Sequence, residues 1–278
     1  MLGVGAAVVS SGCGAAGSVE PPSAAARPGA SAVVWAVGDG ADGGRPAADL
    51  ARRIAGSRVD RFLYLGDVYE NGTAEEFQAY FDRVYGSLVP RTVPTPGNHD
   101  WPRRNDGYFP YWRRALGRPV PSYQALRLGG WDVLSLNSEE PHGLASRQVR
   151  WIRAQVQAPG TCRLAFWHRP RYSAGLHGDQ PDTEPLWKVL RGHATLILNG
   201  HDHDLQRLRP VGGLTEFVVG AGGHGLYRVA SRDPRRAFAD DTRYGALRLT
   251  LRPGLAEYAI VDTEGRTIDA GRVPCRPS

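Results

Sequence analysis

Residues 194–203 read ATLILNGHDH, an apolar run that ends in two histidines separated by one residue. The run has the length and composition of a buried β-strand, and Gly200 follows its end. Two imidazoles just beyond one strand can point into the same cleft, so His201 and His203 are candidate ligands of a metal. By itself, the segment fits hydrogen-bonded core histidines equally well.

Four other segments repeat this arrangement of an apolar run followed by polar residues. The apolar runs are Ala32 to Val37, Phe62 to Leu65, Thr92 to Pro94 and Leu164 to Trp167. The polar residues after them are Asp39, Asp67, Asn98 with His99, and His168. Ligands bind in the crevice at the carboxyl ends of such strands, and we therefore expect these side chains to converge.

The residue types in these segments suit a pair of metal ions. Two cations about 4 Å apart repel each other and need a bridging carboxylate, for which Asp67 is our candidate. Oxygen and imidazole donors suit iron, manganese or zinc, and no cysteine stands among the polar residues that end the segments, which argues against a thiolate site. Such a pair generates a bound hydroxide that attacks phosphorus, while a proton donor serves the departing oxygen.

Together the segments resemble those of the calcineurin-like metallophosphoesterase superfamily, and within it the purple acid phosphatase-like branch. The resemblance covers roughly residues 33–225. It implies an α/β (α+β) fold, a four-layer αββα sandwich in which two mixed β-sheets are flanked by helices. It also implies a cofactor of two metal ions, which are Fe, Mn or Zn.

The resemblance further implies a role for each polar residue of the segments. The first metal would be held by Asp39, Asp67 and His203, and the second by Asp67, Asn98, His168 and His201. His99 would contact the phosphoryl group or protonate the leaving oxygen. His177 lies nine residues after His168, a spacing similar to that of a substrate-binding histidine in this branch, and is a second candidate acid.

Two positions depart from the family pattern. Many superfamily members have a histidine two residues after the first aspartate, where this chain has Ala41. Purple acid phosphatases instead have a tyrosine three residues after the bridging aspartate, where this chain has Glu70, preceded by Tyr69. Either a distorted loop turns Tyr69 inward as a metal ligand, or Glu70 or water fills the place.

Three functions are compatible with these residues. The first is an exported phosphatase that hydrolyses phosphomonoesters by attack of a metal-bound hydroxide. The second is a phosphodiesterase on the same metal centre, which acts on cyclic nucleotides or glycerophosphodiesters. The third is a cell-surface binding protein whose catalysis is impaired at the first metal. Cationic groups that neutralise a dianionic monoester favour the first, and Arg169, Arg171 and His177 are candidates.

The amino terminus predicts export. Residues 1–31 contain a short apolar run, small residues before Cys13, and a tract rich in Ala, Pro, Gly and Ser. They resemble a bacterial lipoprotein signal with Cys13 as the lipidated residue, although an alanine-rich leader is an alternative. We expect an extracellular or cell-surface lipoprotein attached to a membrane through Cys13. Cys162 and Cys275 remain, either as a disulfide or as two free thiols.

Composition agrees with one metallophosphoesterase domain over residues 32–278. The chain has 278 residues, of which 41% are hydrophobic, enough for a substantial core. Its net charge of +6 comes almost entirely from arginine, because Lys188 is the only lysine. A mild positive field favours a small anionic phosphoester substrate. The sequence contains no run of basic residues interleaved with aromatic residues, so we expect no specific nucleic-acid partner.

Hydrophobic periodicity places further elements along the chain. We predict helices over residues 46–55, 73–84, 146–156 and 182–190, and a β-hairpin over residues 123–136. The aromatic-rich residues 101–121 are predicted to form an irregular loop. Residues 220–225 read GAGGHG and match a dinucleotide-binding fingerprint, but no helix pattern follows them. We therefore expect these glycines to form a loop over the metal site.

Overall fold

The computed structural model describes residues 1, 31–159, 161–230 and 232–275. The predicted export segment, including Cys13, lies outside these residues except for its two ends. Within the described ranges, no helix is both long enough and apolar enough to cross a membrane.

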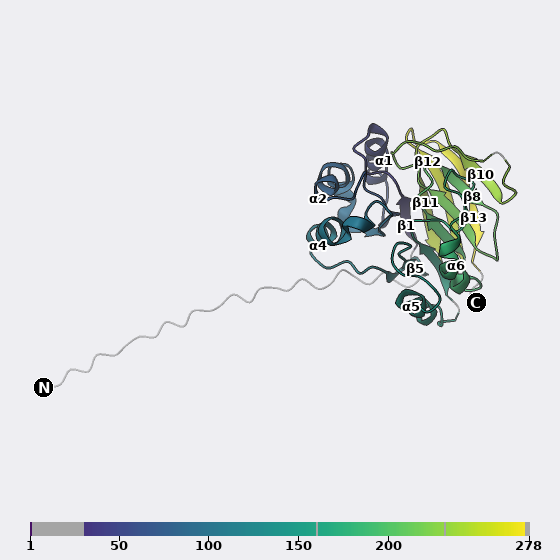
Figure 1. The fold of residues 1–278 in the computed structure, drawn as a ribbon, viewed down its shortest axis with the longest axis horizontal. Helices are drawn as coiled ribbons and strands as arrows, with labels where there is room; N and C mark the ends of the chain where they lie inside the picture. Colours follow the sequence, from purple (N-terminus) through teal and green to yellow (C-terminus); the bar gives the residue numbers. More distant parts are fainter. Residues whose placement is uncertain (2–30, 160, 231, 276–278) are drawn as a thin grey trace.

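Two mixed β-sheets form the centre of the molecule (Figure 1). The first has the strand order β13-β12-β11-β1-β2-β3. Its strands are β1 (Ala32–Val37), β2 (Arg61–Tyr64), β3 (Thr92–Pro94), β11 (Gly245–Arg252), β12 (Leu255–Asp262) and β13 (Thr267–Pro274). Strands β1, β2 and β3 are parallel, so the loops that follow them emerge at the same edge of the sheet.

The second sheet has the strand order β10-β8-β9-β7-β6-β5-β4. Its strands are β4 (Gln124–Leu128), β5 (Trp131–Ser135), β6 (Cys162–Phe166), β7 (Leu196–Asn199), β8 (Leu205–Leu208), β9 (Thr215–Val219) and β10 (Arg236–Asp240). Strands β5, β6, β7 and β9 run parallel to one another. The predicted hairpin is confirmed as β4 and β5, which pair in antiparallel register around Gly129 and Gly130.

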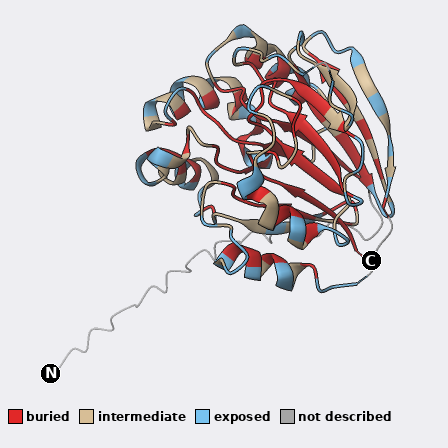
Figure 2. Ribbon diagram, turned by 45° about the vertical axis from the view of Figure 1, so that its right-hand side comes forward, coloured by how far each residue is buried: buried red, intermediate tan, exposed pale blue. Residues whose placement is uncertain are grey.

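Strand β1 shows how the sequence builds the layers. All six residues of this strand are buried, because each face of the strand is covered. Ala32, Val34 and Ala36 pack into the core between the two sheets, whereas the alternating Val33, Trp35 and Val37 pack under helices. Side chains alternate between the faces of a strand, so a continuous apolar run indicates a strand covered on both faces. Figure 2 shows the central strands of both sheets buried in this way.

Helices cover the outer face of each sheet and complete the predicted αββα sandwich. The first sheet is covered by α1 (Arg45–Ala55), the continuous helical segment α2 (Ala74–Glu76), η1 (Phe77–Asp82) and α3 (Arg83–Tyr85), and α4 (Phe109–Leu116). The second is covered by α5 (Arg147–Gln155) and α6 (Glu184–Leu190). Short helical turns complete the set, namely η2 (Gly86–Arg91), η3 (Trp101–Arg103), η4 (Arg104–Tyr108) and η5 (Pro181–Thr183).

The prediction of an irregular loop over residues 101–121 is wrong. This stretch contains η3, η4 and helix α4. Tyr111 stacks on Phe77 with ring centroids 4.7 Å apart, and Trp112 packs edge-on against Phe81 at 4.9 Å. Pro110 lies in the first turn of α4, where proline is tolerated because the backbone N–H there has no partner in the helix. Aromatic packing therefore stabilises a helix that hydrophobic periodicity did not predict.

Cys162 and Cys275 form a disulfide between the start of β6 and the segment after β13. Their Cα atoms are 5.7 Å apart, within the range that a disulfide spans. Both residues are buried in the core between the sheets. The bond therefore joins the C-terminal strand of the first sheet to the second sheet.

Candidate metal centre

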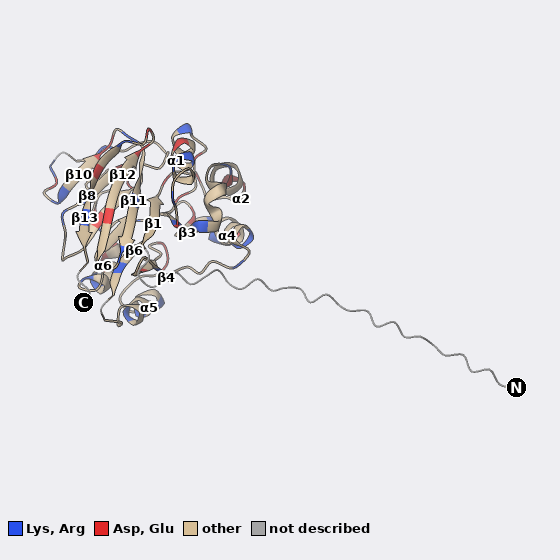
Figure 3. Ribbon diagram, turned by 180° about the vertical axis from the view of Figure 1, so that it is seen from behind, with Lys and Arg blue, Asp and Glu red and all other residues tan. Residues whose placement is uncertain are grey.

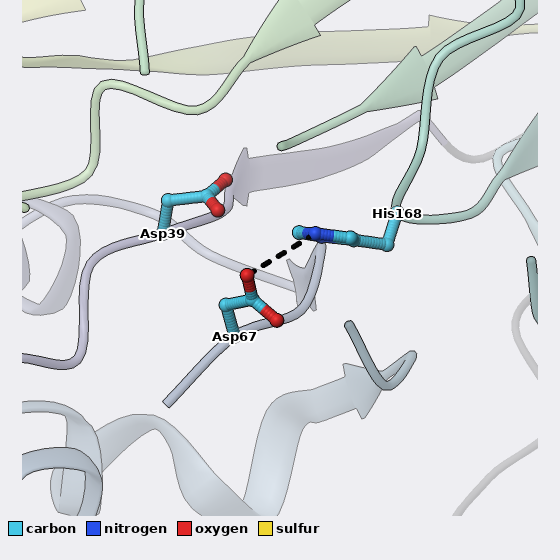
Figure 4. Close-up of side chains that lie close together, drawn as sticks. All are labelled: Asp39, Asp67 and His168. Carbon is cyan, nitrogen blue, oxygen red and sulfur yellow. Dashed lines mark ion pairs between the residues drawn. The ribbon is translucent and has the colours of Figure 1, made fainter. Parts of the chain in front are cut away.

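Asp39, Asp67 and His168 meet at the edge where the parallel strands end (Figure 4). Each follows a strand closely: Asp39 comes after β1, Asp67 after β2 and His168 after β6. One ligand atom of each residue lies within 4.8 Å of the others, and all three side chains are buried. His168 Nε2 lies 3.2 Å from Oδ2 of Asp67. The predicted convergence of strand ends therefore places three donors around one point.

The backbone is strained at this point. Asp39, Asp67 and His201 have φ angles of 58°, 67° and 73°, in the left-handed region that residues with a Cβ atom adopt at a cost of about 1–2 kcal/mol each. Residues held in this way cluster at functional sites because the surrounding structure fixes them. Gly97 allows the close approach, since a Cβ atom there would lie 2.0 Å from Oδ1 of Asp67.

Asn98 and His201 lie beside His168. Asn98 Oδ1 is 3.0 Å from Nε2 of His168, and the rings of His168 and His201 pack edge to face at 5.1 Å. The backbone N–H of His201 donates to Oδ2 of Asp39. Nδ1 of His168 lies 2.8 Å from the Leu65 carbonyl, which fixes Nδ1 as the protonated nitrogen and leaves Nε2 for the cluster.

Tyr69 and His203 complete the cluster on the side of Asp39. The Tyr69 hydroxyl lies 2.8 Å from Oδ1 of Asp39, 3.3 Å from Oδ2 of Asp67 and 2.8 Å from Nε2 of His203. The Glu70 side chain is 64% exposed, and its Oε1 lies 3.6 Å from Nε2 of His224. Of the two possibilities left open by the sequence, the structure turns Tyr69 inward and leaves Glu70 outside.

The charges of the site favour a bound cation. Burial raises the pKa of Asp39 to about 7, despite the opposing charge of His168. For Asp67, burial alone would raise the pKa, but the charge and hydrogen bond of His168 bring it below its ordinary range. Burial opposes protonation of His168 too, yet the two carboxylates raise its pKa to about 10. A metal cation would supply the positive charge that this proton supplies here.

The imidazoles of His201 and His203 are neutral, as metal ligands must be. Burial lowers the pKa of His201 to about 2, with help from the charges of His168 and His177. Burial likewise lowers the pKa of His203 to about 4. Carboxylate, amide, phenol and imidazole donors together suit iron, manganese or zinc. The residues present therefore fit a metal centre.

His99 and His177 lie around this centre. The His99 backbone N–H donates to Oδ1 of Asp67, and its ring packs against Tyr69 at 4.8 Å. The His177 ring stacks on His201 with centroids 4.2 Å apart. Asp202 Oδ1 accepts the backbone N–H of His177 at 2.8 Å and lies 3.2 Å from its Nδ1. Both candidate acids are therefore adjacent to the proposed ligands.

Sequence reasoning overlooked several residues that support the site. Buried Asp100 accepts the backbone N–H groups of Asp67, Val68 and Gly97, and so ties together the loops after β2 and β3. The position of Asp100 two residues after the predicted ligand Asn98 could have indicated that it supports the site. His224 stacks on Tyr69 and Tyr227 stacks on His203, so the predicted loop over the site is confirmed. No sequence motif pointed to Tyr227.

Comparisons with known proteins agree with this geometry. The calcineurin-like phosphoesterase family model matches residues 27–205. Tartrate-resistant acid phosphatase type 5 of Rattus norvegicus is 27% identical over 214 residues, which cover 63% of this chain and 64% of that protein. The Homo sapiens protein is 28% identical over 214 residues, covering 63% and 65%. The match thus spans less than two thirds of these relatives.

Solved structures share the fold. A purple acid phosphatase, PPD1 from yellow lupin (Lupinus luteus) seeds, has a TM-score of 0.74 at 14% identity, covering 88% of this chain and 54% of that one. GAP50, the anchor in the inner membrane complex of Plasmodium, has a TM-score of 0.70 at 13% identity, covering 88% and 89%. The family match extends over more than half of the chain, and the chain therefore belongs to the calcineurin-like phosphoesterase family.

Proposed function

We propose that this protein is an exported phosphatase that hydrolyses phosphomonoesters with the help of two metal ions. The observation that supports this most is the buried group of Asp39, Asp67 and His168, whose ligand atoms lie within 4.8 Å of one another. The similarity to acid phosphatases supports a phosphoester substrate.

Seven residues would hold the metals. We assign Asp39, Asp67, Tyr69 and His203 to the first metal, and Asp67, Asn98, His168 and His201 to the second. When bound, the metals supply an activated water molecule and stabilise negative charge on the phosphoryl oxygens. The carboxylates of Asp39 and Asp67 are buried, which strengthens their electrostatic interaction with a bound cation.

Residues of the chain would manage the leaving group. Hydrolysis by water breaks the phosphorus–oxygen bond directly, with inversion and no covalent intermediate, so the departing oxygen needs a proton. We propose His99 and His177 as donors. Asp202 holds Nδ1 of His177, which leaves Nε2 as its free nitrogen. The side chain of His177 is 38% exposed, and a substrate can therefore reach it.

Phosphodiester hydrolysis is the second candidate, and the state of two arginines favours it. Arg169 forms ion pairs with Glu139 at 3.0 Å and Asp182 at 2.7 Å. Arg171 forms ion pairs with Glu184 and Asp179. These guanidinium groups are already neutralised, which weakens the argument that they recognise a dianionic monoester. The inward position of Tyr69 argues against a binding protein with a defective first-metal site, and Ala41 is the feature that still favours one.

The disulfide supports export. Disulfides such as Cys162–Cys275 form and persist in oxidising compartments outside the cytosol. We propose that the protein is an extracellular or cell-surface lipoprotein attached through Cys13. Fractionation of cells that express the full chain, and of cells that express a Cys13→Ala variant, tests this. Recovery of the wild-type chain in the membrane fraction and of the variant in the soluble fraction is the expected result.

Elemental analysis of the purified protein, paired with hydrolysis assays, tests the activity. We expect about two metal ions per chain and faster hydrolysis of p-nitrophenyl phosphate than of bis(p-nitrophenyl) phosphate. Preference for the diester would replace the monoester assignment with the second candidate. A protein that contains fewer than two metals and hydrolyses neither compound, even after incubation with Fe, Mn and Zn salts, would contradict the proposal.

A further inference from the structure

The loop between β9 and β10 contacts the proposed first-metal ligands Tyr69 and His203. We call residues 220–227, which read GAGGHGLY, the 220–227 loop. Two of its side chains, His224 and Tyr227, stack on proposed ligands, and its backbone bonds to the ligand segments. The loop is therefore attached to the ligand segments by both its side chains and its backbone.

The backbone of the loop contacts two segments that carry ligands. The N–H of His224 donates to the carbonyl of Asp39, and the N–H of Tyr227 donates to the carbonyl of His203, each at 3.0 Å. The carbonyl of Gly225 lies 2.8 Å from Nδ1 of His203. This carbonyl can only accept, so Nδ1 carries the proton and Nε2 faces Asp39 and Tyr69.

The side chains of the loop contact the ligand rings face to face. The His224 ring lies on Tyr69 with centroids 4.0 Å apart and an interplanar angle of 13°. The Tyr227 ring lies on His203 at 3.9 Å and 12°. His99 packs edge-on against Tyr69 at 4.8 Å, so His224 and His99 both limit the movement of this phenol ring.

His224 is itself fixed by charged neighbours. Its Nδ1 lies 3.3 Å from Oδ2 of Asp42 in the loop after β1, and its Nε2 lies 3.6 Å from Oε1 of Glu70. The imidazole therefore connects the loops after β1, β2 and β9 at the Tyr69 ring. A phenol ring held by packing loses less conformational freedom when its oxygen binds a metal, which strengthens binding.

The position of Tyr69 explains why such support matters. Ala41 provides no donor atom, so the first metal depends on a phenol oxygen from the adjacent loop. We propose that His224 is a positioning residue that stacks on Tyr69 and holds its hydroxyl in the first-metal site. This inference rests on the proposed two-metal function, and it concerns retention of the first metal in particular.

The experiment compares three variants of the full chain with the wild type. His224→Ala removes the stacked ring, and His224→Phe restores a flat ring without the contacts to Asp42 and Glu70. His193→Ala is the matched control, because His193 is exposed and lies beside α6, away from the cluster. Each protein is loaded with Zn²⁺ and equilibrated with increasing concentrations of a chelator. Metal per chain is measured by mass spectrometry, and the melting temperature by circular dichroism.

We expect His224→Ala to lose one metal at a chelator concentration about 10- to 100-fold lower than the wild type, as for other residues that orient ligands. His224→Phe should retain both metals nearly as well as the wild type, and His193→Ala should match it. A melting temperature measured in the metal-free state shows that each variant is folded.

Three outcomes would overturn the inference. His224→Ala could retain both metals as firmly as the wild type, which would show that the stacked ring does not hold Tyr69. His224→Phe could lose the metal like His224→Ala, which would assign the effect to the contacts with Asp42 and Glu70. Wild-type protein that binds fewer than two ions when loaded with Zn²⁺, and also when loaded with Fe or Mn, would overturn the proposed function and this inference with it. The first two outcomes leave the proposed function intact.

Discussion

The phenol oxygen of Tyr69 lies 2.8 Å from Oδ1 of Asp39, although the two residues are thirty positions apart. Asp39 follows β1 and Tyr69 lies in the loop after β2, and the parallel pairing of these strands brings the two loops together. The contact places an oxygen donor where Ala41 provides none. Retention of the first metal should therefore depend on Tyr69.

Replacement of Tyr69 by phenylalanine tests this dependence. Tyr69→Phe retains the ring that stacks on His224 but removes the oxygen atom. We expect the first metal to be lost at a chelator concentration at least about tenfold lower than in the wild type, with a matching loss of hydrolysis. Glu70→Gln is the comparison, because it alters the other candidate ligand, whose exposed carboxylate contacts His224, and leaves the phenol oxygen in place. A larger effect of Glu70→Gln than of Tyr69→Phe would assign the ligand to Glu70.

Replacement of His201 by alanine addresses the second metal. The burial and lowered pKa of His201 keep its ring neutral and able to bind a cation. We expect His201→Ala to abolish hydrolysis and to reduce the metal content from about two ions to one per chain. Atomic emission of the purified variant gives the count. If both metals and turnover persisted, His201 would not be a ligand.

Replacement of His177 by alanine separates proton donation from metal binding. His177 stacks on His201, but its Nδ1 is held by Asp202. We expect His177→Ala to retain both metals and to lower kcat about 100-fold, which is typical of a lost general acid. The loss should be greater for alkyl phosphates than for p-nitrophenyl phosphate, whose leaving group needs no proton. Equal losses on both substrates would exclude His177 as the acid.

Loss of the disulfide should lower stability without affecting the metal site. Cys162 and Cys275 are 113 residues apart in the sequence, and Cys162 lies at the opposite end of β6 from His168. The double variant Cys162→Ser and Cys275→Ser should lose about 2–4 kcal/mol in free energy of unfolding, measured in urea. Its metal content should equal that of the wild type. A change in metal content would show that the bond also orders the strand ends.

Glu216 should make stability depend on pH. Burial raises the pKa of this β9 carboxyl to about 8, while the unfolded chain has the ordinary value near 4.5. Between these values, unfolding releases a proton, so the contribution of Glu216 to stability is present below pH 4.5 and falls as pH rises toward 8. The decrease is at most about 1.4 kcal/mol per pH unit.

Comparison with Glu216→Gln isolates this contribution. The amide cannot ionise, so the free energy of unfolding of the variant should gain on that of the wild type as pH rises from 5 to 8. Urea titrations at several pH values give the difference. A difference that is independent of pH would show that Glu216 titrates near its ordinary pKa when folded.

The structure shows where the arginines lie and which carboxylates they contact, which the sequence does not. The net charge of +6 comes from arginines that Figure 3 shows on several helices and strands rather than on one element. Arg169 and Arg171 lie one and three residues after the site histidine His168, which suggested a role in substrate recognition. In the structure, Arg169 forms an ion pair with Glu139, and Arg171 forms one with Glu184.

The sequence determined the layers and the positions of the predicted ligands. A fully apolar strand such as β1 must be covered on both faces, and a polar residue directly after a parallel strand must lie at the shared edge. Asp39, Asp67 and His168 follow this rule. These features are local, because they depend on the strand and the residue that ends it.

Only the tertiary structure decided which groups from distant segments touch. The inward turn of Tyr69, the stacking of His224 and Tyr227 on proposed ligands, and helix α4 all depend on packing between segments far apart in the chain. Ring stacking and burial are set by the shape of neighbouring surfaces, and a hydrophobic period in one segment carries no information about that shape. For this reason the sequence located the metal centre, while the fold determined what surrounds and supports it.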